Sequence, residues 1–139
     1  MYESALYNLF TGDSALVALL GTYNTKPAVF DQVAPEAAPF MYLVYEISKY
    51  GEDSGAVSRF LVDINLFDMN SSREPARNAV ERIEYLLKFK TLTHARYSQI
   101  RHYTPDILVI DEGDPSCIHY NIRCDAKAVE TKWINSITH

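Results

Sequence analysis

The sequence has few cysteines, few basic residues and no long apolar run. Its longest uncharged run, residues 14–25, has 12 residues, well short of the ~20 that a membrane-spanning helix needs. Thirteen Lys and Arg against 18 Asp and Glu leave a net charge of −5. The short run argues against insertion in a membrane. An acidic domain repels phosphate, which argues against general affinity for nucleic acid.

The two cysteines indicate a reducing setting. Cys117 and Cys124 lie in what reads as one strand and point to opposite faces, so they cannot pair with each other. Glu3 stands where an export signal would carry positive charge, and the first basic residue is Lys26. We therefore expect a protein with free thiols that stays in the cytoplasm in which it is made.

Two short helical segments are expected at the N-terminus. Tyr2 to Phe10 has apolar residues at helical spacing, and a turn follows. Asp13 or Ser14 can cap a second segment that ends at Gly21. Two prolines in residues 34–39 then break any helix and lead into a strand.

Two strands are expected next. Residues 40–48 place Leu43 and Tyr45 on one face and Tyr42 and Val44 on the other, so both faces start apolar. Residues 60–66 alternate between apolar and polar side chains, as a half-buried strand does. The polar stretch 49–58 is expected to be a loop of about ten residues, which is long for a hairpin and marks a contact element.

The clearest helix runs from Ser72 to about Phe89, with one apolar stripe. Ser71 and Glu74 have the spacing of a capping box, and Pro75 falls in the first turn.

The final third is expected to form strands over residues 97–103, 106–110 and 116 to about 126. A turn at 111–115 would join the last two, and centring it on Gly113 sets Asp106 opposite Tyr120. Residues 127–139 show no clean period and are interpreted as an arm that docks on a neighbouring subunit.

These elements predict an α+β fold in which a mostly antiparallel sheet carries one long amphipathic helix on a face, beside a short N-terminal helical lobe. Residues 1–126 are expected to form a single domain, and residues 127–139 the C-terminal arm.

One nuclease-like pattern is present: Pro105 and Asp106, then Asp125 with Lys127 two residues later. In such nucleases two carboxylates hold a divalent cation and the lysine stabilises charge. The hairpin register places Asp125 about 17 Å from Asp106 and on the other face, which argues against a shared metal.

No other catalytic or metal pattern is complete. Cys117 and His119 share one strand face, but two ligands are too few for zinc. The acidic residues of the turn lack the arrangement that wraps calcium. We expect no cofactor and no resident metal.

Four stretches carry a resemblance to a known family: residues 5–10 with 13–21, residues 38–45, residues 60–68 and residues 73–87. In this order and length they resemble the tail-completion, or tail-terminator, proteins encoded in the head-to-tail module of long-tailed bacteriophages and prophages. The resemblance spans residues 5 to about 126.

The resemblance implies a non-enzymatic virion protein whose copies form a ring, usually a hexamer. The ring would cap the tail tube and join it to the head-tail connector, with DNA passing through without specific binding. An acidic lumen would let DNA slide, and for that role we single out Asp111, Glu112 and Asp114. The expected subunit interface is formed by Tyr42, Val44, Tyr50, Glu52, Asp53, Trp133 and Ile134.

Two alternatives remain from the sequence. A head-completion adaptor or other minor virion protein would differ only in the ring that it contacts. A metal-dependent nuclease would need Asp106, Asp125 and Lys127 to converge. The virion would be the final location, after assembly in the host cytoplasm.

Overall fold

The computed structural model describes residues 2–53, 56–94 and 96–131. The chain has an α+β fold, as the sequence predicts. Its elements, in order, are α1 (Tyr2–Thr11), α2 (Ser14–Val17), β1 (Thr22–Tyr23), β2 (Lys26–Pro27), β3 (Val29–Asp31), β4 (Tyr42–Asp53), β5 (Val57–Met69), α3 (Glu74–Phe89), β6 (Tyr97–His102), β7 (Asp106–Asp111) and β8 (Cys117–Glu130).

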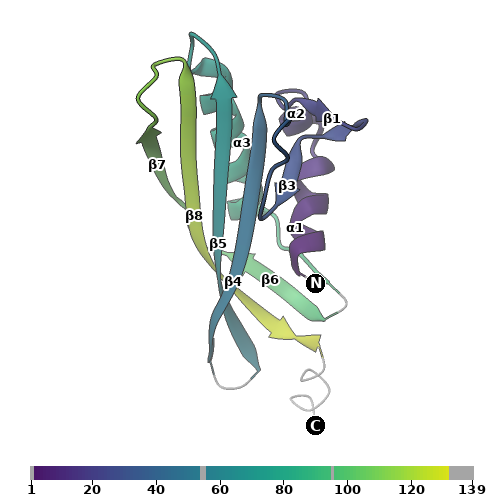
Figure 1. The fold of residues 1–139 in the computed structure, drawn as a ribbon. Coiled ribbons are helices and arrows are strands. Elements are labelled where there is room, and N and C mark those ends of the chain that lie inside the picture. Colours follow the sequence, from purple (N-terminus) through teal and green to yellow (C-terminus); the bar gives the residue numbers. More distant parts are fainter. Residues whose placement is uncertain (1, 54–55, 95, 132–139) are drawn as a thin grey trace.

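One large sheet organises the molecule, with the strand order β3-β4-β5-β8-β6 and with β7 also paired to β8 (Figure 1). All its pairs are antiparallel except β3 with β4. Strands β6 and β7 share one edge of β8: β6 pairs with its C-terminal part and β7 with its N-terminal part. β8 is therefore bonded along both edges, and β7 lies at the outside.

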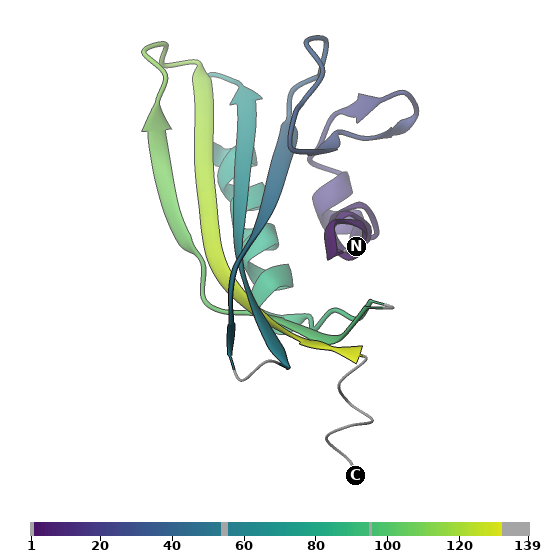
Figure 2. The ribbon, with the colours of Figure 1, turned by 60° about the horizontal axis from the view of Figure 1, so that its bottom comes forward.

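The helices lie on one side of this sheet, with α3 behind the long strands in both views (Figures 1 and 2). The apolar stripe of α3 is buried, as its periodicity predicts; its members are Ala76, Ala79, Val80, Ile83, Leu86 and Leu87. Alternate residues of β4, β5 and β8 face the same core, among them Leu43, Ile64 and Ile122. No described helix covers the other side, which we call the open face, and none is long and apolar enough to cross a membrane.

The two helix starts differ in how well the sequence predicted them. Asp13 caps α2 as expected, accepting a hydrogen bond from the Leu16 amide at 2.9 Å, although α2 itself ends at Val17. The capping box of α3 is wrong: Arg73 occupies the cap position without a side-chain bond. The Glu74 amide donates instead to the Ser72 hydroxyl, because the helix begins two residues later than the motif requires.

The long loop expected at residues 49–58 is also wrong. β4 continues to Asp53 and pairs with β5 up to Asp53 opposite Val57, so most of the expected loop is strand. A register shift between Lys49 and Gly51 marks a bulge. The bulge absorbs one residue, which explains why the polarity pattern fails to read as a regular strand.

Two expectations about the C-terminal third need correction. The β7–β8 hairpin sets Asp106 opposite Arg123, so the register that placed it opposite Tyr120 is wrong by three residues. β8 runs to Glu130, so the first residues of the expected arm, 127–130, are strand. Trp133 and Ile134 lie outside the described residues. Both cysteines are free, as predicted.

Candidate interaction surface

An aromatic row crosses the open face of the sheet. Tyr42, Phe67, His119 and Ile110 are direct cross-strand neighbours on β4, β5, β8 and β7. Tyr42 stacks on Phe67 with 5.2 Å between ring centroids, and Phe67 stacks on His119 at 4.2 Å. Phe30 of β3 extends the row to the far edge. Stacked rings in successive strands give this part of the open face an apolar, rigid character.

A hydrogen-bonded network lies next to the aromatic row. Asn121 donates from Nδ2 to Asp63 Oδ1 at 2.7 Å and to Asn65 Oδ1 at 3.1 Å. His119 Nε2 lies 2.7 Å from the same Asn65 oxygen. His119 and Asn121 are buried although they point to the open face, because neighbouring side chains cover them. The network fixes these polar groups in one arrangement.

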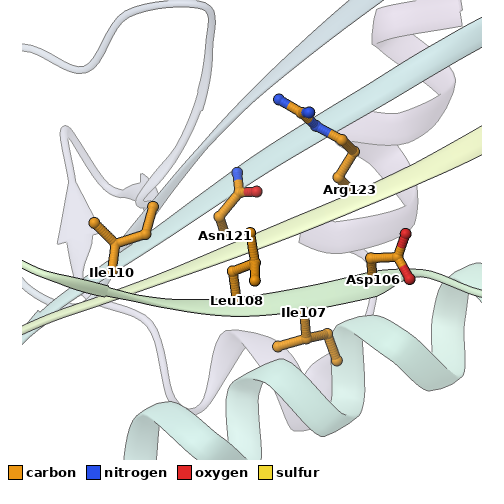
Figure 3. Close-up of a pocket in the computed structure, with 6 residues that line it drawn as sticks. All are labelled: Asp106, Ile107, Leu108, Ile110, Asn121 and Arg123. Carbon is orange, nitrogen blue, oxygen red and sulfur yellow. The ribbon is translucent and has the colours of Figure 1, made fainter.

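Strand β7 is the most exposed apolar segment of the described chain. Leu108 and Val109 are 62% and 55% exposed, and Ile107 and Ile110 are more than one-third exposed. Figure 3 shows Leu108 on the side of Asn121 and Arg123, while Ile107 points to the opposite side of the sheet. A hollow on this edge is lined by Asp106, Ile107, Leu108, Ile110, Asn121 and Arg123. β7 pairs with β8 and with no other described strand.

Sequence periodicity predicts an ordinary strand over residues 106–110 and marks none of these side chains as a site. The available signal is the uninterrupted run Ile-Leu-Val-Ile between two aspartates. A half-buried strand alternates between apolar and polar residues, and a central strand has a longer apolar run. A short apolar run between charges is also compatible with an edge strand that another chain covers.

A second exposed apolar group lies beside β3, at the edge of the sheet opposite to β7. Val33, which follows β3, is 77% exposed, and Phe40, which precedes β4, is 47% exposed. Phe40 also contacts Tyr42 of the aromatic row. Apolar side chains are thus exposed at both edges of one sheet.

The three acidic residues singled out by the sequence lie together in the exposed β7–β8 turn. Asp111 accepts a hydrogen bond from the Gly113 amide, and Asp114 accepts two from Ser116. Those bonds lower the pKa of Asp114. Glu112 Oε1 lies 2.5 Å from His119 Nδ1, which links the turn to the aromatic row.

The expected interface residues on β4 fall in two separate places. Tyr42 and Val44 are half-buried on the open face at the start of β4. Tyr50 and Glu52 are exposed at its far end, which finishes at Asp53.

Local contacts hold the side chains at this far end. The Tyr50 hydroxyl donates to Asp125 Oδ1 at 3.1 Å, and the Arg59 guanidinium lies over the Tyr50 ring. Glu52 binds Lys49 at 2.8 Å. The expected interface residues of β4 therefore lie at two separate places along this strand.

The corrected register changes the geometry of the nuclease-like residues. Asp106 is opposite Arg123, so Asp125 is its diagonal neighbour on the same face, roughly 7–8 Å away by ordinary sheet spacing. The expected separation of 17 Å is therefore wrong. Asp106, Arg123 and Asp125 line one shallow hollow, and Arg123 lies 3.6 Å from Asp63. Within the described residues no group of three or more His, Cys, Asp or Glu side chains is placed to hold a metal ion.

Known structures share this fold. A chain of a structure described as the virion of a native gene transfer agent particle superposes with a TM-score of 0.67 and 19% identity, over 92% of this chain and 93% of that one. A second solved chain gives a TM-score of 0.59 and 10% identity, over 92% of this chain and 96% of that one. Identities this low show the fold alone.

No curated protein sequence matches the chain significantly. The family model described as tail completion protein gp17 matches residues 4–128, which contain nearly every element of the fold from α1 to β8. The match makes this chain a structural protein of a phage-like virion. The chain belongs to the tail completion protein gp17 family.

Proposed function

We propose that copies of this chain form a hexameric ring that caps the completed tail tube and joins it to the head, with DNA passing through the opening. The observation that carries the proposal is the apolar edge strand β7, exposed in a chain of a virion family. Exposed apolar segments of this kind are usually covered by another protein.

A ring also needs a second, different surface on each subunit, because a head-to-tail contact joins unlike patches. Three places are proposed for it: the open face around Tyr42 and Val44, the end of β4 with Tyr50, Glu52 and Asp53, and the arm with Trp133 and Ile134. The apolar residues beside β3 remain for contact with the tail tube protein or the head-tail connector proteins.

Charge supports passage of DNA without binding. Each chain carries a net charge of −5, so a ring of six is strongly acidic. We place Asp111, Glu112 and Asp114 at the lumen, where carboxylates would repel phosphate and keep DNA mobile. In this proposal the protein is made in the host cytoplasm and ends in the neck or tail of the particle.

Two measurements test the proposal together. Light scattering of the purified chain is expected to give six times the 15.8 kDa subunit mass. Particles made without the protein are expected to yield heads and tails that remain separate in electron micrographs. Tails that join heads normally in the absence of the protein would overturn the proposal. Heads that lose their DNA although the tails are intact would favour a head-completion adaptor.

A metal-dependent nuclease is the second candidate, because Asp106 and Asp125 are diagonal neighbours on one face. Lys127 follows two residues later on the same face of β8. The candidate requires DNA cleavage that depends on Mg²⁺ or Mn²⁺ and disappears in Asp125→Ala, with Glu36→Ala as an exposed carboxylate control. Equal cleavage by all three proteins, or none by the native chain, rejects it.

A further inference from the structure

Among the described strands only β8 pairs with β7, so one edge of β7 is left free, and both faces of β7 are apolar. Leu108 and Ile110 point to the open face, and Ile107 and Val109 alternate to the helix side, where α3 leaves them largely exposed. A partner that only covered the open face would leave two of the four residues in water. A strand added along the edge would cover both sides and satisfy the backbone groups.

The ends of β7 specify the charge of that partner. Asp106 and Asp111 bound the apolar run, and Glu112 and Asp114 follow in the turn. A partner strand is therefore expected to carry apolar residues on both faces, at least one basic residue and no acidic one.

One segment of the chain has this composition. Residues 132–139 read Lys-Trp-Ile-Asn-Ser-Ile-Thr-His, with no acidic residue. In an extended strand Trp133 and Ile137 would share one face and Ile134 would take the other. We propose that residues 132–139 of one subunit add as a strand to the free edge of β7 in a neighbouring subunit.

Chain reach separates Trp133 from the β7 strand of its own subunit. Asp106, the nearer end of β7, is opposite Arg123, seven residues before Glu130 on β8, or about 24 Å along the strand. Trp133 is two residues beyond Thr131, a reach of about 7 Å. β6 also occupies this edge of β8 between the two points. Trp133 can meet β7 only in another subunit.

This inference rests on the proposed ring and names its contact. Each subunit would present the C-terminal arm and, near the N-terminal end of β8, the receiving strand β7. The two halves are unlike, so the contact is head-to-tail and repeats from subunit to subunit. Backbone hydrogen bonds would supply affinity, and the apolar side chains would set the register.

Two double variants of the full chain test the contact by light scattering. Leu108→Glu with Ile110→Glu breaks the receiving strand, and Trp133→Glu with Ile134→Glu breaks the arm. Each variant alone is expected to be monomeric. Mixed together they are expected to form a one-to-one dimer and nothing larger, because the mixture has one intact arm and one intact β7. Tyr85→Glu with Phe89→Glu, two exposed apolar residues of α3, is the matched control and should assemble as the native chain does.

The outcomes separate this inference from the ring itself. A native oligomer that survives both double variants overturns the arm contact and leaves the ring standing. If the arm variant still assembles, or if the mixture forms no dimer, β7 binds something other than the arm. Either result also overturns the arm contact. A native chain that is monomeric overturns both. Circular dichroism checks folding, and Leu108→Ser replaces the β7 pair if that variant unfolds.

Discussion

The carboxylate of Asp13 accepts two hydrogen bonds from the guanidinium of Arg82, at 2.8 Å from Nε and 2.7 Å from Nη2. The same carboxylate caps α2. One side chain thus starts the second helix and ties the N-terminal lobe to α3. The Arg82 guanidinium, through its hydrogen bonds, holds the pKa of Asp13 below its ordinary value.

Removing this pair is expected to destabilise the fold. Arg82→Met should lower the free energy of unfolding by about 1–2 kcal/mol, because a partly buried bidentate pair is lost and Asp13 keeps only its cap. Arg77→Met, an exposed arginine of the same helix, is the control and should change it by less than about 0.5 kcal/mol. Urea unfolding followed by circular dichroism measures both. Equal effects would show that the pair contributes nothing specific.

A second prediction concerns pH and a buried histidine. The His102 Nε2 atom is hydrogen-bonded to the Tyr2 hydroxyl, and burial lowers the pKa of His102 to about 4. In the unfolded chain this histidine has a pKa near 6.5. The free energy of unfolding therefore keeps its full value above that pH and falls as the pH drops from 6.5 towards 4. The loss should approach roughly 2–3 kcal/mol at pH 4.

The same measurement on His102→Gln isolates this effect. The variant is expected to be less stable than the native chain at pH 7.5, yet to lose less stability between pH 6.5 and 4.5. His94→Gln, at a less buried site, is the control and should follow the native profile. Identical slopes in the native chain and His102→Gln would contradict the assignment.

The buried amide of Asn121 gives a third prediction. Asn121→Leu should destabilise the chain by about 1–3 kcal/mol, because Asp63 and Asn65 each lose a donor in a place that water enters poorly. Asn78→Leu on the exposed side of α3 should have little effect. Thermal unfolding measures the difference, and a neutral Asn121→Leu would mean that water replaces the amide without cost.

A fourth prediction tests the acidic turn. Replacing Asp111 and Asp114 by Asn, and Glu112 by Gln, removes three negative charges while keeping the size of each side chain. If these residues line the lumen, DNA exit from assembled particles should slow, most clearly at low salt. Glu81→Gln with Glu84→Gln, which removes two negative charges from α3, is the control. Unchanged DNA release would remove the turn from the lumen.

Sequence periodicity predicted the elements well where one physical signal dominated. The α3 stripe and the alternation in β5 and β8 each reflect one buried face, and these elements are confirmed. The end of β4 was missed because a bulge interrupts its alternation between Lys49 and Gly51. A prediction from periodicity assumes regular alternation along the strand, so it misses the extra residue that a bulge inserts.

The candidate surface was harder to predict because it depends on pairing between distant strands. A three-residue error in the β7–β8 register moved Asp106 away from Asp125 and hid the neighbourhood that the fold creates. The exposure of β7 was missed because its apolar run fits a buried strand as well as an edge strand, and only the pairing with β8 decides between them.

The single-sided pairing of β7 also bears on the fate of unassembled chains. A strand bonded along one edge opens at a lower free energy than β8, which is bonded along both, so its amides should exchange hydrogen first. Opening would expose residues 106–111 to proteases, and incorporation into a particle would close that route. Cleavage in β7 would then fall on free subunits and spare copies already built into particles.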